Sequence, residues 1–469
     1  MVRLPTTFTW GAATAAFQIE GDRAGRGETI WDAFCRVPGA VVDGTDGDVT
    51  CDHVNRYRED VRILADLGVD AYRFSVAWAR VQPTGRGDFS AEGLGFYDRL
   101  VDELLGAGIE PWLTLYHWDL PLELQHLGGW ASRRTVEAYV EYALGVQDAL
   151  GDRVKRCATH NEPWCAAWLG HGGGIHAPGI RDHALASRAT HHLLLSHGRA
   201  VAAMREVDPE AAYGIVLNLD AARATDDAHV TQEAVRAYDG VRTRVWLDAL
   251  AGRGYPADTV ELLAPHLDGA VLPGDMEQIA TPVDFLGLNY YNDALLESSD
   301  GALPPVDLVQ PGLERVRTAD PGEGATAMDW PVTPEGFTDI LRRTLTEYPE
   351  LGPVYVTENG SAWDDEAPSP DGVVEDAPRV AYLHAHLDAL AAARAEGLDV
   401  RGYFAWSLLD NFEWALGLSK RFGLVRVDFA TQERTLKRSW HAYREAIAAD
   451  RTSRTGPAGP DQPDLTSRT

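Results

Sequence analysis

The sequence predicts an α/β protein that folds as a single (β/α)8 TIM barrel with elaborated loops after its strands. Short β-branched or aromatic runs alternate with longer segments of helical apolar spacing, which is the pattern of repeated βα units and a parallel sheet. Eight such runs can be placed, and eight strands close this type of barrel. The chain has 469 residues, a length that one barrel reaches when its loops carry insertions.

The expected strands and helices follow each other in order along the chain. The strands are residues 9–18, 71–78, 111–117, 154–162, 213–218, 285–291, 354–359 and 402–409. Amphipathic helices are expected at residues 57–67, 93–105, 135–150, 184–207 and 334–348. Each of these helices lies between two expected strands, as a barrel of βα units requires.

Two stretches rich in Gly, Pro and Asp, residues 297–325 and 364–378, could be loops of one barrel or linkers between domains. A cut at either place would leave an incomplete barrel, so we interpret both as long loops. The barrel domain is therefore expected to span residues 1–450. Residues 451–469 are rich in Pro, Ser, Thr and Gly without apolar periodicity, and we expect a disordered C-terminal tail there.

The charge of the chain limits its expected partners. Acidic residues outnumber basic ones by 71 to 42, and the formal net charge of -29 repels phosphate backbones and anionic lipid surfaces. Nucleic acid and membranes are therefore not expected as partners, while the oligomeric state stays open. The N-terminal residues lack the apolar stretch of a signal peptide, and no run approaches the ~18 apolar residues of a membrane span. A cytoplasmic location is expected.

Neither a metal nor an organic cofactor is expected. The four cysteines are too few for a disulfide framework and form no Cys-x-x-Cys pair, so we interpret them as buried free thiols. His183, His191, His192 and His197 could suggest a metal cluster, but their spacings to His197 do not share one helix face as i, i+4 would. We interpret that segment as a structural helix.

Two glutamates stand at the carboxyl ends of expected strands. In VKRCATHNEPW the strand stops at Glu162, because Pro163 has no N–H for a sheet ladder. In PVYVTENGSAW the apolar run stops at Glu358, and Gly360 permits a turn. Because the carboxyl ends of barrel strands converge on one face, both carboxylates are predicted to project into the same mouth.

A pair of carboxylates fits the hydrolysis of a glycosidic bond, which needs a proton for the leaving oxygen and a second carboxylate facing the anomeric carbon. We expect Glu162, beside neutral Asn161 and aromatic Trp164, to have a raised pKa and to donate the proton. Glu358 would stay ionised as the nucleophile. Arg73, a charge inside an apolar strand, should have an acidic partner, and Glu358 or another acid could be that partner.

Polar and aromatic side chains gather at the other expected strand ends. Sugars combine hydroxyls with apolar faces, so a sugar site needs amides and carboxylates beside flat aromatic rings. A single Trp is more often a core residue, but the clustering favours a sugar site. The residues concerned are Gln18, His117, Trp118, Asn289, Tyr291, Trp406, Glu413 and Trp414.

Several motifs in the same order resemble glycoside hydrolase family 1, the family of β-glucosidases and β-galactosidases. They are FTWGAATAAFQIEG, RFSVAWARVQP, LYHWDLP, THNEPW, LGLNYY, VTENG, WSLLDNFEWALG and KRFGLVRVDF, and they cover about residues 8–445. The resemblance implies a retaining exo-acting β-glycosidase that releases terminal β-D-glycosyl residues through a covalent glycosyl-enzyme intermediate. It implies β-glucosidase activity first, with β-galactosidase, β-fucosidase and transglycosylation open. The implied substrates are small β-glucosides or β-linked oligosaccharides, including those of cellulose degradation.

The resemblance also implies roles for individual residues. Glu162 is implied as the acid/base and Glu358 as the nucleophile, supported by Arg73 and Tyr291. Trp330 is implied to line the leaving-group side. The implied sugar-binding residues are Gln18, His117, Trp118, Asn161, Asn289, Trp406, Glu413, Trp414 and Phe422.

Two rival functions and one departure from the family pattern deserve mention. A non-catalytic sugar-binding relative would share the fold, although both glutamates are present here. A 6-phospho-β-glycosidase would carry a smaller residue at the position of Glu413, together with cationic phosphate ligands. The departure is His160, which stands where Phe is common before Asn, and we expect it to change the pKa of Glu162.

Overall fold

Eight parallel strands close into a barrel in the computed structural model, which describes residues 8–267, 269–304, 307–365 and 368–455. Around the barrel the strand order is β1-β11-β10-β7-β5-β4-β3-β2, so the last barrel strand in sequence pairs with the first and closes the barrel. The predicted (β/α)8 barrel is confirmed. Its strands are β1 (Thr9–Ala13), β2 (Ala71–Ser75), β3 (Glu110–Tyr116), β4 (Arg156–Asn161), β5 (Ala212–Asn218), β7 (Phe285–Asn289), β10 (Val354–Asn359) and β11 (Val400–Trp406).

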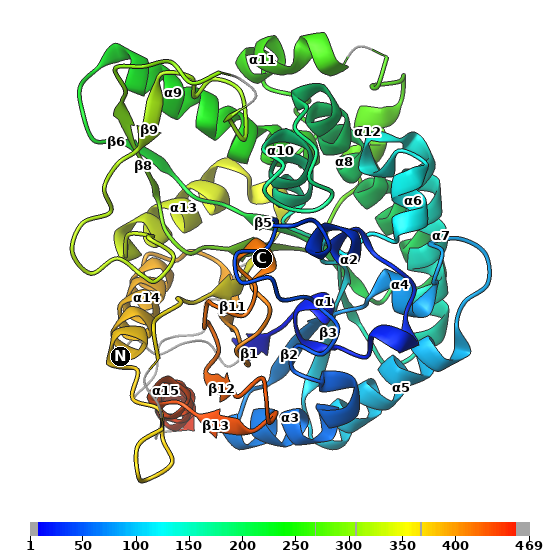
Figure 1. Ribbon diagram of the computed structural model, residues 1–469, viewed down its shortest axis with the longest axis vertical. Coiled ribbons are helices and arrows are strands. Elements are labelled where there is room, and N and C mark those ends of the chain that lie inside the picture. The colour runs from blue at the N-terminus through cyan, green and yellow to red at the C-terminus, as the bar shows by residue number, and fades with distance from the viewer. Residues whose placement is uncertain (1–7, 268, 305–306, 366–367, 456–469) are drawn as a thin grey trace, which may run out of the picture.

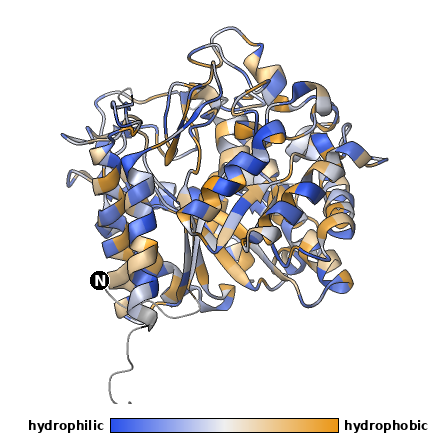
Figure 2. Cartoon of the chain, turned by 90° about the horizontal axis from the view of Figure 1, so that it is seen from below, coloured by the Kyte–Doolittle hydropathy of each residue, from blue (hydrophilic) through white to orange (hydrophobic). Residues whose placement is uncertain are grey.

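Helices form a ring around these strands, as Figure 1 shows. Asp182 and Ser90 act as N-caps by accepting hydrogen bonds from backbone N–H groups of the first turn of α8 (His183–Val207) and α5 (Ala91–Gly106). Hydrophobic residues gather on the strands and on the inward helix faces in Figure 2. The five expected helices are present as α3 (His53–Leu67), α5 (Ala91–Gly106), α7 (Arg133–Leu150), α8 (His183–Val207) and α13 (Pro334–Glu347), and α14 (Ala377–Ala395) connects β10 to β11.

Two strands are shorter than expected because helices begin close to their carboxyl ends. The helix α1 (Ala16–Ile19) follows β1, and α4 (Trp78–Val81) follows β2. The backbone N–H of Ala16 donates to Ser75 Oγ at 2.8 Å, which satisfies a donor at the start of α1 and ties the two strand ends together. Gln18 therefore lies on a short helix above the barrel rim, and the expectation of a strand at residue 18 is wrong.

The amino-terminal half of the barrel interior is filled by aromatic rings. Trp112 meets Phe285, Tyr355 and Phe404 at centroid distances of 5.4, 4.8 and 5.1 Å. Layers of large side chains are the usual filling of such a barrel, which makes it a packed core and not a pore. This aromatic layer packs directly below the polar groups that lie nearer the carboxyl ends of the strands.

The loop connections differ from the sequence expectation in two places. The stretch 297–325, expected to be irregular, contributes to a small sheet of β6 (Ala222–Ala224), β8 (Ala294–Ser298) and β9 (Val316–Thr318) beside α9 (His229–Asp239) (Figure 1). At the other end, α15 (Arg438–Thr455) continues past residue 450. The expected tail is therefore helical at its start, and residues 456–469 lie outside the described residues.

A buried group of charges ties the last part of the chain to the barrel. The Lys437 side chain is 0 % exposed and contacts the carboxylates of Asp365 and Asp410, the latter at 2.7 Å. Arg379 contacts Asp365 at 3.0 Å, and Arg421 contacts Asp410 at 2.7 Å. Because buried charges are stable only when paired, these contacts fix the segment before α15 against the loop 364–378 and the chain after β11.

Replacing Lys437 by Met should destabilise the fold strongly. The substitution leaves two buried aspartates short of a cation, which typically costs about 3 to 5 kcal/mol of unfolding free energy. Calorimetry should show a lowered melting temperature. The matched control is Arg438→Met at the next position, where the side chain is 51 % exposed and pairs with Glu375 at the surface. An unchanged melting temperature for Lys437→Met would contradict the importance of the cluster.

Candidate active site

Both glutamates lie at irregular strand ends, Glu358 within β10 and Glu162 one residue after β4. The parallel pairing of β4 with β5 shifts register between Ala158 and Asn161, and the pairing of β10 with β7 shifts between Val356 and Glu358. Glu162 itself has a left-handed backbone with φ of 44°, which is uncommon for a residue with a side chain. Such irregularities re-aim side chains and store strain near functional sites.

The shift in β10 places consecutive side chains inside the barrel. Tyr355 belongs to the interior aromatic layer, and the Thr357 hydroxyl donates to Asn289 Oδ1 at 2.7 Å. Strict alternation would then turn Glu358 outward. Because the register slips after Val356, Glu358 instead faces the interior, where its side chain is 3 % exposed.

The shift in β4 has the opposite effect on His160. Thr159 and His160 both turn toward α8, where they contact His197 at 2.7 Å and Ser196 at 2.8 Å. The His160 ring also stacks on Tyr139 of α7 at a centroid distance of 4.6 Å. The register slip turns the His160 side chain to the helices outside the barrel, and its expected effect on the pKa of Glu162 stays a prediction.

Arg73 is the centre of the polar interior layer. Its side chain is 2 % exposed, and Nη1 donates to Glu358 Oε1 at 2.5 Å. Nη2 donates to Asn161 Oδ1 at 2.6 Å, and Nε donates to Thr114 Oγ1 at 3.1 Å. Arg73 therefore has the acidic partner that a buried cation requires, and that partner is Glu358.

Glu162 is held by neutral groups. Asn289 Nδ2 donates to Glu162 Oε1 at 2.7 Å, and the Cys165 thiol donates to Glu162 Oε2 at 3.2 Å. The same Asn289 amide donates to Asn161 Oδ1 at 3.0 Å, so it connects the surroundings of Glu162 to those of Arg73. Glu358 receives a second hydrogen bond at 2.6 Å from the Tyr291 hydroxyl.

Burial raises the pKa values of both glutamates. For Glu162, the hydrogen bonds from Asn289 and Cys165 oppose the rise. For Glu358, burial raises the pKa to about 7; Arg73 opposes this rise, and the charge of Glu162 adds to it. Arg73 therefore offsets only part of the cost of removing the Glu358 carboxylate from water, and the expected ionisation of Glu358 as the nucleophile stays a prediction.

Aromatic rings surround the polar layer on two sides. His117 stacks on Trp406 and on Trp414 at centroid distances of 5.8 Å, and Trp118 lies 4.6 Å from Trp414. On another side, Trp330 is 5.5 Å from Tyr291 and 6.1 Å from Phe422. The structure thus brings together Gln18, Arg73, His117, Trp118, Asn161, Glu162, Asn289, Tyr291, Trp330, Glu358, Trp406, Glu413, Trp414 and Phe422 through contacts with one another or through mutual charge effects.

Several buried polar atoms of this layer have no protein partner. Gln18 donates to Asn411, to the Phe412 carbonyl and to Glu413, but its Oε1 atom is buried without a hydrogen bond. His117 Nε2 accepts from Asn161 at 3.1 Å, and its Nδ1 atom is left without a partner. Such atoms are costly unless a ligand or water satisfies them, so they indicate a site for a polar molecule.

The contact of Cys165 with Glu162 was missed by sequence reasoning. All four cysteines are free, and Cys165 was expected only to be a buried free thiol. The chain from Trp164 has helical backbone angles, which brings residues three apart onto one face. The spacing between Glu162 and Cys165 was the signal that could have revealed the contact.

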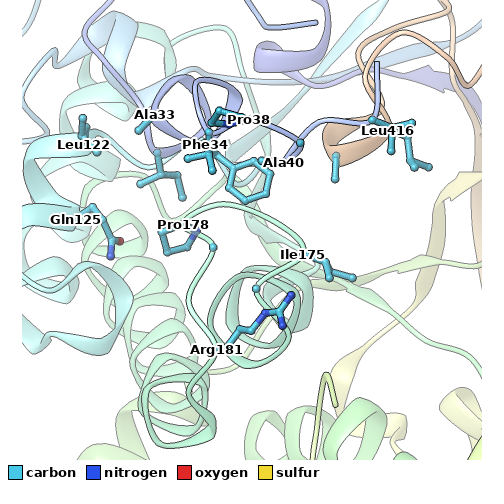
Figure 3. Close-up of a pocket in the computed structure, with 17 residues that line it drawn as sticks. Ala33, Phe34, Pro38, Ala40, Leu122, Gln125, Ile175, Pro178, Arg181 and Leu416 are labelled. Atoms are coloured by element: carbon cyan, nitrogen blue, oxygen red, sulfur yellow. The ribbon is translucent and has the colours of Figure 1, made fainter. Parts of the chain in front are cut away.

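A hollow of about 610 Å³ opens beside α2 (Ile30–Cys35), as Figure 3 shows. It is lined mostly by apolar side chains, among them Phe34. Phe34 packs on Trp31 at 5.3 Å, and Trp31 packs on Trp414 at 4.7 Å. The rings of Phe34, Trp31 and Trp414 therefore lie between the hollow and the polar layer, and neither glutamate lines the hollow.

Comparison with known proteins shows the family to which this chain belongs. Residues 1–452 match the model of glycosyl hydrolase family 1. This chain is a member of that family. It is 43% identical to β-glucosidase A of Thermotoga maritima over 450 residues, which are 95% of this chain and 98% of that protein. It is 44% identical to a bifunctional β-D-glucosidase/β-D-fucosidase of Bifidobacterium breve over 458 residues, which are also 95% of this chain and 98% of that protein. The solved family 1 β-glucosidase of Thermotoga maritima has a TM-score of 0.90 and 42% identity, covering 96% of this chain and 99% of that one.

The histidines of α8 have separate hydrogen-bond partners. His191 contacts Tyr255 and Asp275, and His192 contacts the Trp130 carbonyl. Across the described residues no group of three or more His, Cys, Asp or Glu side chains could hold a metal ion. Within the same residues no helix is long and apolar enough to cross a membrane.

Glu413 should make stability depend on pH. Burial and the charges of Glu358 and Glu162 raise its pKa to about 8, against an ordinary value of 4.5. Between these values the folded state binds an extra proton, so the stability of the wild type falls as pH rises through this window. Glu413→Gln should gain stability over the wild type between about pH 5 and pH 8.5, on the order of 4 kcal/mol at most.

Denaturant titrations at both pH values measure this gain. Glu396→Gln is the control, because Glu396 lies at the surface and Arg342 lowers its pKa. An equal stability difference for Glu413→Gln at both pH values would show that Glu413 titrates normally.

Proposed function

We propose that this family 1 member is a retaining, exo-acting β-glycosidase, foremost a β-glucosidase, with Glu162 as acid/base and Glu358 as nucleophile. The observation that carries the proposal is the unequal environment of two buried carboxyls in one interior layer. Glu358 takes hydrogen bonds from the charged Arg73 and from Tyr291, whereas Glu162 takes them from the neutral Asn289 and Cys165. Unequal environments give unequal roles to paired carboxyls.

In the first step Glu358 attacks C1 of the terminal sugar. Protonated Glu162 gives its proton to the glycosidic oxygen, the bond from C1 to the leaving group breaks, and a covalent glycosyl-enzyme forms. The raised pKa of Glu162 suits a group that must carry a proton near neutral pH. The hydrogen bonds from Arg73 and Tyr291 hold the Glu358 carboxylate in one orientation for attack.

In the second step Glu162 acts as a base. Its carboxylate takes a proton from water, the water oxygen attacks C1, and Glu358 departs, so that two inversions restore the β configuration. A sugar hydroxyl in place of water would give transglycosylation, because both reactions share the covalent intermediate.

The terminal sugar would be bound by the unsatisfied polar atoms and the rings around them. Gln18 Oε1 and His117 Nδ1 can bond sugar hydroxyls, and Trp406 and Trp414 offer flat faces. Asn161 would bond the 2-hydroxyl, an interaction that strengthens in the transition state. On the leaving-group side we assign Trp330, which packs on Tyr291 and Phe422.

The names of the relatives support the choice of sugar. One relative is a bifunctional β-D-glucosidase/β-D-fucosidase. Another is a 1,4-β-D-glucan glucohydrolase of Thermotoga neapolitana. It is 40% identical over 453 residues, which cover 95% of this chain and 98% of that protein. We therefore expect short β-linked glucose oligosaccharides and aryl β-glucosides as substrates, with β-fucosides next. The cytoplasmic location expected from the sequence stays a prediction.

The rival functions fit the site less well. A non-catalytic sugar-binding protein would not need a cation and a phenol directed at one carboxyl. A 6-phospho-β-glycosidase would need free cationic ligands, but Arg73 in this layer is already bonded to Glu358, Asn161 and Thr114.

Substitution of each glutamate should separate their roles on an activated aryl β-glucoside. Glu358→Gly should abolish turnover, because no covalent intermediate can form. Glu162→Ala should lose about 10²- to 10⁴-fold on substrates whose leaving groups need a proton, and less on dinitrophenyl β-glucoside. Glu396→Gln, at the surface, is the control. An inactive wild type, or a Glu358→Gly variant with unchanged kcat, would overturn the proposal.

External azide should rescue the Glu162→Ala variant. The small anion needs no base, so it can attack the glycosyl-enzyme in place of water and release a β-glycosyl azide. Proton NMR of the product distinguishes the two anomers. An α-azide would contradict a retaining mechanism with Glu358 as the nucleophile.

A further inference from the structure

A chain of polar groups runs from Glu162 outward through the loops. The Cys165 thiol lies 3.2 Å from Glu162 Oε2, and the side-chain amide of Asn218 lies 3.3 Å from the Cys165 Sγ. With its oxygen turned toward Arg242, the same amide accepts hydrogen bonds from Nη2 and Nη1 of that residue at 2.9 and 3.0 Å. In this orientation the same oxygen faces both Arg242 and the Cys165 Sγ, so the cation lies next to the residues that contact Glu162 but is not joined to it by a continuous hydrogen-bond relay.

Arg242 is held firmly in this place. It belongs to η4 (Gly240–Arg244), its side chain is 13 % exposed, and it pairs with Asp220 at 3.0 Å. The guanidinium carbon lies 3.9 Å from the ring centroid of Trp164, two residues after Glu162 in the chain. Stacking and pairing together fix the charge beside the segment that carries the acid/base.

We propose, on the basis of the function proposed above, that Cys165 and Arg242 are positioning residues for Glu162. Cys165 fixes the orientation of the carboxyl group through its thiol. Arg242 supplies a fixed positive charge that favours the carboxylate form of Glu162, which the second step needs. Asp220 moderates this charge by pairing with it. Cys165, Arg242 and Asp220 therefore set the balance between the acid form of Glu162 used first and the base form used second.

Other charged and titratable groups also face Glu162, from several elements. Glu358 on β10, Glu413 before η7 (Trp414–Leu416) and Tyr291 after β7 each interact electrostatically with it. Arg73 on β2 is a second cation, but its hydrogen bonds go to Glu358, Asn161 and Thr114. Burial raises the pKa of Glu162, and the charges of Arg242 and Arg73 oppose that rise.

Two substitutions should move the pKa of Glu162 in opposite directions. Arg242→Gln removes the cation and should raise the pKa by about one unit, because an opposite charge nearby favours ionisation. Asp220→Asn removes the partner that moderates Arg242 and should lower it. Arg244→Gln is the matched control, because this arginine of the same helix pairs with Asp239 and Asp258 instead.

Carbon-13 NMR of protein labelled at the glutamate carboxyl carbons measures these shifts, with Glu162→Gln to assign the signal. The high-pH limb of kcat/KM on an aryl β-glucoside should move in the same directions. Shifts of the same sign in both variants, or none, would overturn the role of Arg242. The NMR titration needs no turnover, so its result stays separate from a failure of the proposed glycosidase activity.

The thiol is tested by leaving-group dependence. Cys165→Val removes the donor and should lower kcat/KM about fivefold for an alkyl β-glucoside, whose departure needs a well-placed proton. For dinitrophenyl β-glucoside the loss should be smaller, and Cys165→Ser, which keeps a donor, should restore the alkyl substrate. Equal losses on both substrates, or no rescue by serine, would overturn the role of Cys165.

Discussion

One buried guanidinium holds the polar interior together. Arg73 on β2 reaches Thr114 on β3, Asn161 on β4 and Glu358 on β10, so its three donor nitrogens join parts of the barrel that are distant in sequence. A cation in this place is tolerable only when each of its donors is satisfied, and each partner is in turn bonded further outward. The geometry of the carboxyls is thereby set before any ligand binds, which is the arrangement that favours fast chemistry.

The same polar layer holds more carboxyl groups than cationic side chains. Glu162, Glu358 and Glu413 share an interior in which Arg73 is bonded to Glu358, and burial raises the pKa of all three carboxyls. Such an arrangement opposes folding and is kept because the chemistry needs protons that can be exchanged near neutral pH. The folded state is therefore less stable because of these carboxyls, and this loss accompanies a site in which Glu162 can act first as an acid and then as a base.

The sequence predicts the barrel well because strand and helix periodicities are local properties. The run at 354–359 was placed exactly, and the pairing expected of Arg73 follows from one charge in an apolar strand. The outward direction of His160 could not be predicted, because a register slip is not visible in a linear pattern and strict alternation would put its side chain inside. The contacts of Arg242 with Asn218 and Trp164 were also missed, because they join segments that approach each other only after the barrel closes.

The buried charges around Lys437 have a consequence for the timing of assembly. Asp410, which Lys437 contacts, stands midway in the chain between Trp406 and Trp414, and these two rings flank His117. A nascent chain that has emerged only as far as α14 already contains both glutamates, yet it has neither the rings nor the lysine that anchors their loop. The site is complete only once Lys437, which directly precedes α15, has left the ribosome, so a late part of the chain anchors a centre whose two glutamates are made earlier.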